Sequence, residues 1–99
     1  MWRKAAKTSE WEDGQGKPVA LGDKQLALFK VGGQFYALDN ACPHRGGPLG
    51  EGHLDGAEVT CPWHAWTFDV KTGDCLSTPD TKQKTFPVKV EGDDILIDL

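Results

Sequence analysis

Cys42-Pro43-His44 and Cys61-Pro62-Trp63-His64 are the two segments of this sequence that decide its fold. Each segment carries one cysteine and one histidine, and sixteen residues (45–60) separate the two segments. A thiolate and an imidazole only one or two residues apart are too close to spread freely around a single tetrahedral ion. Each pair can, however, reach two neighbouring metals. The spacing therefore indicates one site with four ligands and more than one metal ion.

Two irons bridged by sulfide fit this spacing, because each segment can give its cysteine to one iron and its histidine to the other. Cys42 and Cys61 then hold one iron, and His44 and His64 hold the second, as in Rieske [2Fe–2S] centres. The longer strings at 42–49 (CPHRGGPL) and 61–69 (CPWHAWTFD) resemble those of the small soluble Rieske ferredoxins. The resemblance spans nearly the whole chain and implies one [2Fe–2S] cluster per chain.

A structural zinc site is the alternative, because two cysteines and two histidines are also a common zinc ligand set. Zinc modules usually place two cysteines two to four residues apart and then two histidines. In this chain the two ligand types alternate within each segment. The order counts against zinc, and with zinc the chain would be a metal-stabilised interaction module without redox work.

The Rieske resemblance also implies a range for the reduction potential. High-potential relatives carry a second cysteine in each segment, and they place a serine and a tyrosine hydroxyl against the cluster sulfurs. The matching positions in this chain are Gly47, Trp63, Trp66 and Phe68, which supply neither a disulfide nor a hydroxyl. Rieske centres span about −150 to +300 mV, and hydrogen bonding sets the position within that range, so we expect a low potential toward about −150 mV.

Short runs of alternating or clustered apolar residues recur along the chain. They predict strands at 24–31, 34–38, 58–60, 65–70, 86–90 and 95–99. Gly32-Gly33 predicts a two-residue hairpin turn, and residues 91–94 predict a second turn. No stretch has a long helical period, so the fold class is all-β. The resemblance implies the rest: an antiparallel β-sandwich of the kind found in Rieske iron–sulfur proteins, with a small cluster-binding subdomain inserted at about 40–80.

The composition is typical of a globular protein, since 38% of the residues are hydrophobic and 26% are charged. With 99 residues the chain has room for a single domain, 1–99, of marginal stability, and cluster ligation should contribute to its folding. A net charge of −4 argues against nucleic acid as a partner and suggests docking by acidic patches. No apolar run of signal-peptide or membrane length is visible, so we expect a cytoplasmic protein with no membrane association.

Three further residues have side chains that could take part in the function, but none of them shows metal-ligand spacing. Cys75 lies far from both segments and is expected to be a packed strand residue rather than a ligand or redox thiol. His53 is expected on a surface loop between the segments. Arg45, beside His44, either tunes the cluster field and steers a partner or is a solvated surface arginine.

The residues left after cluster ligation argue for an electron carrier rather than an enzyme. Rieske oxygenases react at a separate iron held by two histidines and a carboxylate, and only His53 remains here. The sequence also has no nucleophile–base pair left for hydrolysis and no glycine motif for a flavin or nicotinamide. We therefore expect a ferredoxin that passes single electrons from a flavin-containing reductase to a terminal oxygenase, such as an aromatic-ring dioxygenase. The alternative is the Rieske-type small subunit of an NAD(P)H-dependent nitrite reductase, bound to its large subunit.

Overall fold

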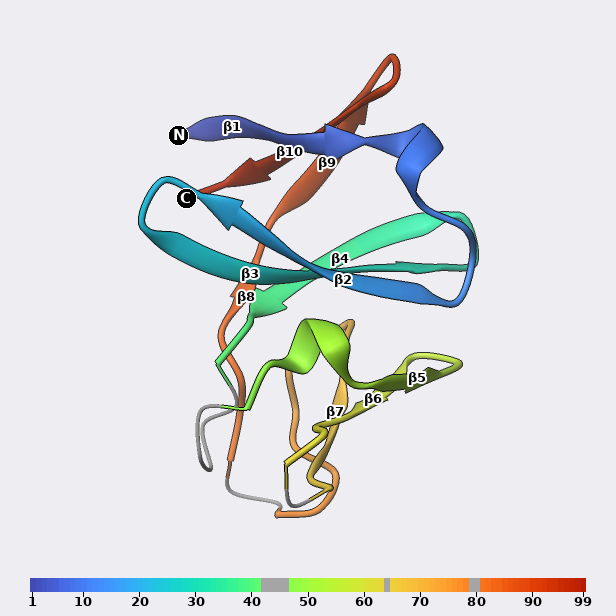
Figure 1. The fold of residues 1–99 in the computed structure, drawn as a ribbon, viewed down its shortest axis with the longest axis vertical. Coiled ribbons are helices and arrows are strands. Elements are labelled where there is room, and N and C mark those ends of the chain that lie inside the picture. Colours follow the sequence, from blue (N-terminus) through green and yellow to red (C-terminus); the bar gives the residue numbers. More distant parts are fainter. Residues whose placement is uncertain (42–46, 64, 79–80) are drawn as a thin grey trace.

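The computed structural model describes residues 1–41, 47–63, 65–78 and 81–99. Within these ranges the chain forms ten strands and two short 3-10 helices (Figure 1). The strands are β1 (Trp2–Lys7), β2 (Gln15–Leu21), β3 (Lys24–Val31), β4 (Gln34–Asp39), β5 (His53–Asp55), β6 (Glu58–Thr60), β7 (Thr67–Asp69), β8 (Thr85–Phe86), β9 (Val88–Glu91) and β10 (Asp94–Asp98). The 3-10 helices are η1 (Thr8–Glu10) and η2 (Leu49–Glu51).

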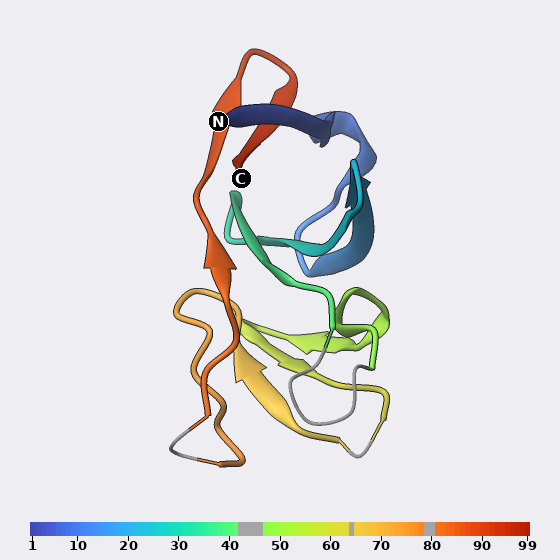
Figure 2. The ribbon, with the colours of Figure 1, turned by 90° about the vertical axis from the view of Figure 1, so that its left-hand side faces the viewer.

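The strands pair into three antiparallel sheets with the orders β1-β10-β9, β2-β3-β4-β8 and β5-β6-β7. Figures 1 and 2 show the first two sheets together in the upper part of the molecule, and β5-β6-β7 with η2 below them. The predicted all-β class is confirmed. The lower sheet lies within the range expected for the inserted subdomain, and the two upper sheets form the sandwich, which we call the base.

The sheet β2-β3-β4-β8 is the middle layer, and β3 shows why. Residues 26–29 are four consecutive residues that are all fully buried. A strand with one solvent-exposed face would instead alternate between buried and exposed residues. Leu26 and Leu28 belong to an apolar core shared with Ile95 of β10, inside the base. The two residues that alternate with them belong to a second core shared with Phe68 of β7. The middle sheet therefore separates the core inside the base from the core that the base shares with the subdomain.

The two hairpin predictions had different outcomes. Strands β3 and β4 pair around Gly32-Gly33 as expected, and both glycines have positive φ. The strand predicted at 86–90 is wrong as one element, because it divides at Pro87 into β8 of the middle sheet and β9 of the outer sheet. Proline has no N–H for a ladder, so it suits the point where the chain changes sheets. The turn that follows is shorter than predicted, since residues 91 and 94 pair with each other.

Three strands that the sequence patterns did not predict are also present. β1 pairs with β10 at the other end of the chain, with an irregularity between Lys4 and Ala6. β2 pairs with β3, and β5 begins at His53, which faces Thr60 of β6. His53 is exposed as expected, but it lies on a strand and not on a loop. No helix in the described part of the chain is long and apolar enough to cross a membrane.

Candidate metal centre

The second cysteine–histidine segment lies on the loop of the β6-β7 hairpin. Thr60 and Thr67 are the last pair of this hairpin, and beyond them the Cys61 N–H donates to the carbonyl of Trp66 over 2.8 Å. This bond closes a loop around residues 62–65. Cys61 itself is almost fully buried, whereas Trp63 is about half exposed, at 51%. His64 lies outside the described residues.

The first segment follows β4 in sequence, and the described residues on its two sides pair with each other. Ala41 and Pro48 form an antiparallel bridge, so the chain leaves the base and returns to it at one point. The Leu49 N–H donates to the carbonyl of Asn40 over 2.8 Å, which ties η2 to the end of β4. Residues 42–46, which include the predicted ligands Cys42 and His44 together with Arg45, lie outside the described residues.

Gly47 brings the two loops into direct contact. A Cβ built on Gly47 would lie 2.7 Å from Cys61 Sγ and 3.0 Å from Trp63 Cγ, which is closer than side-chain atoms pack. The backbone of the first loop therefore runs against the predicted sulfur ligand of the second loop. Only glycine allows this approach. The structure thus places Gly47, three residues after the predicted ligand His44 in sequence, against Cys61 and Trp63 of the second segment.

Ala65 is the only non-glycine residue with positive φ in the described part of the chain, at 56°. The left-handed conformation costs an L-residue about 1–2 kcal/mol, so the surrounding loop must impose it. Ala65 directly follows the predicted ligand His64 in sequence. The backbone of the second loop is therefore turned sharply next to a predicted ligand position.

The residues around the second loop pack against the core and the β6-β7 hairpin. Trp66 is partly buried against the core that contains Phe68, as expected for core packing. Cys75 is 4% exposed in the same core, which confirms the predicted packing, but it forms an isolated backbone bridge with Phe68 and lies outside the ten strands. Ser77 Oγ accepts a hydrogen bond of 3.0 Å from the Thr67 N–H and so joins the following segment to the hairpin.

Negative charge is concentrated in the subdomain. The described residues from 47 to 78 include five carboxylates and one lysine, whereas the other described residues include nine of each sign. Asp55, Glu58 and Asp69 are aligned across β5, β6 and β7, and none of the three forms an ion pair with another described residue. Like charges directly opposite each other repel, so this row is unfavourable within the subdomain.

A family model for the Rieske [2Fe-2S] domain matches residues 1–91. The chain belongs to this family. The ferredoxin component of the naphthalene 1,2-dioxygenase system of Pseudomonas aeruginosa is 42% identical to it over an alignment of 99 positions, which covers 99% of this chain and 95% of that protein.

Solved structures show the same fold. A chain in a complex of reduced oxygenase and oxidized ferredoxin of carbazole 1,9a-dioxygenase matches with a TM-score of 0.88 at 34% identity, over 97% of this chain and 91% of that one. A putative nitrite reductase NADPH small subunit matches with a TM-score of 0.85 at 21% identity, over 100% of this chain and 99% of the other. At that identity the second match shows the fold alone.

Membership of the Rieske family implies a [2Fe–2S] cluster. The described residues fit such a group: a buried cysteine sulfur lies beside a glycine backbone, and two loops meet at that point. Sequence reasoning missed two polar residues next to the site, Asn40 and Gln83, because they belong to no motif. Their buried position is visible only once the strands are assembled.

Proposed function

We propose that this chain is a one-electron carrier, a Rieske ferredoxin that accepts electrons from a flavin-containing reductase and passes them to a terminal oxygenase. The single observation that carries the proposal is the contact of Gly47 with Cys61 Sγ. It supports one composite site made by both cysteine–histidine segments. When bound, the [2Fe–2S] cluster takes up and releases one electron at a time.

We assign the cluster to four ligands: Cys42 and Cys61 on one iron, and His44 and His64 on the other. The spacing within the two segments carries this assignment, and Cys75 and His53 lie outside both segments. Cys75 is packed in the core beside Phe68, and His53 lies exposed on β5. One cluster per chain follows, since one set of four ligands is available.

The chain's own residues have three roles in this carrier. Cys61 is buried, which keeps water from its sulfur and limits loss of the ligand to solvent. Gly47 allows backbone to approach that sulfur closely. Trp63, about half exposed, presents an aromatic face beside the site on the outer surface.

The oxygenase is favoured as the electron acceptor by the relatives. The naphthalene relative is named as a ferredoxin component of a dioxygenase system, and the carbazole neighbour was solved with an oxygenase. Both cover nearly the whole of this chain. The match to the nitrite reductase small subunit, at 21% identity, supports only the fold. It gives no specific support for the small-subunit role. We place the electron transfer in the cytoplasm, where a cysteine such as Cys75 stays reduced.

An electron paramagnetic resonance spectrum, taken before and after dithionite reduction, tests the proposal. Iron, sulfide and zinc are assayed on the same sample. We expect equal iron and sulfide, and a signal that appears only on reduction with an average g below the free-electron value. A sample loaded with zinc and lacking iron would refute the proposal.

The potential and the acceptor need separate measurements. Redox titration should give a midpoint toward about −150 mV, because Trp66 and Phe68, at the positions of the serine and the tyrosine, have no hydroxyl to donate to the sulfurs. A midpoint above roughly +100 mV would contradict that argument. Stopped-flow mixing of the reduced protein with a terminal oxygenase should give fast reoxidation. Obligate co-purification with a nitrite reductase large subunit would instead support the alternative.

A further inference from the structure

Two polar side chains are buried among the described residues, and both lie where the subdomain joins the base. Asn40, 8% exposed, follows β4, and Gln83, 6% exposed, precedes β8. A buried amide without hydrogen-bond partners is costly, so its partners show what it is there to hold. Both residues contact the chain next to the first ligand loop.

The side chain of Gln83 holds the start of that loop. Its Nε2 donates to the carbonyl of Asp39 over 2.9 Å and to the carbonyl of Ala41 over 2.7 Å. Its Oε1 accepts from the Lys84 N–H over 3.0 Å. Both N–H groups of the amide are therefore used on carbonyls that flank Asn40. Ala41 immediately precedes Cys42, so the carbonyl that Gln83 holds belongs to the peptide bond entering the predicted ligand.

The backbone of Gln83 is hydrogen-bonded to the turn that follows β7, the second strand of the hairpin that carries the second loop. Its N–H donates to the carbonyl of Gly73 over 2.7 Å. A Cβ on Gly73 would lie 2.3 Å from the Gln83 carbonyl oxygen, and Gly73 has a φ of 83°, so this turn requires glycine on both counts. Gly73 in turn donates to the carbonyl of Asp69, the last residue of β7. Gln83 thus contacts the segment that enters the first loop and the turn that follows β7, the strand that leaves the second loop.

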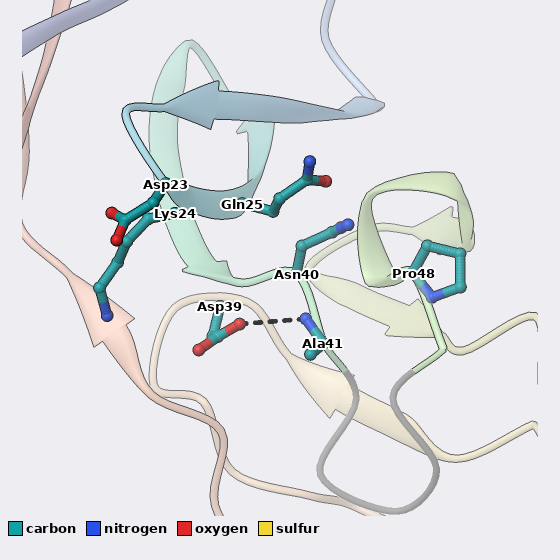
Figure 3. A pocket seen from close by; sticks show the side chains of 7 residues that line it. All are labelled: Asp23, Lys24, Gln25, Asp39, Asn40, Ala41 and Pro48. Carbon is teal, nitrogen blue, oxygen red and sulfur yellow. Dashed lines mark hydrogen bonds between the residues drawn. The ribbon is translucent and has the colours of Figure 1, made fainter.

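Asn40 joins the start of the first loop to its end. Its carbonyl accepts from the Leu49 N–H, and its Oδ1 accepts from the Gly50 N–H, each over 2.8 Å. Asn40, Ala41 and Pro48 are among the residues that line a pocket at the end of β4, and Figure 3 shows Asn40 and Pro48 above Ala41. In the same view the Ala41 N–H donates to Asp39 Oδ1 over 3.1 Å. The described residues on the two sides of the first loop are therefore held by side chains as well as by their backbone bridge.

We propose that Gln83 is a positioning residue for the cluster: it fixes the first ligand loop relative to the hairpin that carries the second. The inference rests on the proposed function, because it assumes ligands from both loops. Four ligands on two separate loops bind a metal centre tightly only if the two loops keep a fixed position relative to each other. Gln83 hydrogen-bonds to both supporting segments, and Asn40 joins the described residues on the two sides of the first loop.

Gln83→Met tests this proposal, because methionine has a similar length and volume but no N–H donors. Trp11→Phe is the matched control. Trp11 is also 6% exposed, and its Nε1–H donates to the carbonyl of Leu28 over 3.2 Å inside the base. Both variants lose buried side-chain-to-backbone hydrogen bonds, so both should lower the melting temperature. Only Gln83→Met should change the cluster.

The measurements are the rate of iron loss to a chelator at a temperature where all variants are folded, and the g values of the reduced protein. We expect Gln83→Met to lose iron about 10- to 100-fold faster than the wild type, the usual effect of removing a residue that supports metal ligands, and to have shifted g values. Trp11→Phe should match the wild type in both. If Gln83→Met also matches the wild type in both, Gln83 is only a structural residue and the inference is overturned.

A second variant and a prior measurement on the wild type make the result interpretable in every case. If Gln83→Met does not fold, Gln83→Asn takes its place, since it keeps an amide but withdraws the donors by one methylene. The wild-type spectrum is read first: absence of iron and of a reduced-state signal refutes the proposed function itself. A normal wild type with an unaffected Gln83 variant refutes only the positioning role.

Discussion

Gly47→Ala is the most direct perturbation of the contact between the two loops. The added methyl group would lie 2.7 Å from Cys61 Sγ and 3.0–3.1 Å from Trp63, where ordinary contacts begin at 3.4 Å. The two loops must therefore separate by at least 0.7 Å along the line to the sulfur. Gly47 is not among the glycines with positive φ, so the whole effect comes from this contact and not from backbone strain.

The magnitude follows from overpacking. Inserting one methyl group into a closely packed site costs about 1–3 kcal/mol. For a domain of this size about 1 kcal/mol lowers the melting temperature by roughly 4–8 °C. Because the strained contact involves a predicted cluster ligand, the variant should also retain less iron and give an altered signal in electron paramagnetic resonance. Thermal unfolding, an iron assay and the reduced spectrum measure the three effects.

Gly56→Ala is the matched control on the β5-β6 turn. Its Cβ would meet nothing within 4 Å, but its φ of 61° makes alanine strained by about 1–2 kcal/mol. It should lower the melting temperature by a comparable amount and leave iron content and spectrum unchanged. The reasoning fails if Gly47→Ala has wild-type stability, iron content and spectrum, or if Gly56→Ala disturbs the cluster equally.

Three further substitutions test other parts of the site. Cys42→Ser or His64→Cys should abolish or transform the reduced-state signal, while His53→Ala should leave it intact; loss of the signal in the His53 variant would require a different ligand set. Cys75→Ser should keep the spectrum but lower the free energy of unfolding by about 1–3 kcal/mol, because a hydroxyl replaces a thiol in an apolar core; urea unfolding measures it, and a changed spectrum would make Cys75 part of the site. Ala65→Gly should raise the melting temperature of the iron-loaded protein slightly, since relief of about 1–2 kcal/mol of strain exceeds the entropic cost of glycine, about 0.4–1 kcal/mol; a lower melting temperature would argue against that strain.

Much of the fold could be predicted where pairing is local. The β3-β4 hairpin and β6 have the predicted bounds to within one residue, because apolar runs and a Gly-Gly turn specify them locally. β1 could not be predicted in this way: all six of its residues are exposed or half-exposed, and its partner β10 lies at the other end of the chain. The division at Pro87 was missed because both halves are good strand sequences, and only the sheet arrangement separates them.

The chemistry of the site could be predicted from the sequence, but the residues that hold its loops in place could not. The cysteine–histidine pattern alone indicates the Rieske family, which the family model and the relatives confirm, together with the electron-carrier role named in those relatives. The four ligands stay a prediction. Asn40 and Gln83 gave no signal, because an isolated amide has no spacing rule and Gln83 bonds to residues more than 40 positions away in the sequence.

The uneven distribution of charge makes the molecule an electric dipole along its length. The described residues from 47 to 78 have an excess of four carboxylates, while the other described residues have equal numbers of acidic and basic residues, and the molecule is 37 Å long. A basic surface therefore exerts a torque that turns the subdomain toward it before contact. The screening length is about 10 Å at 0.1 M ionic strength, so this alignment acts in the last stage of approach and weakens as salt is added. Orientation during encounter is built into the chain without any specific contact.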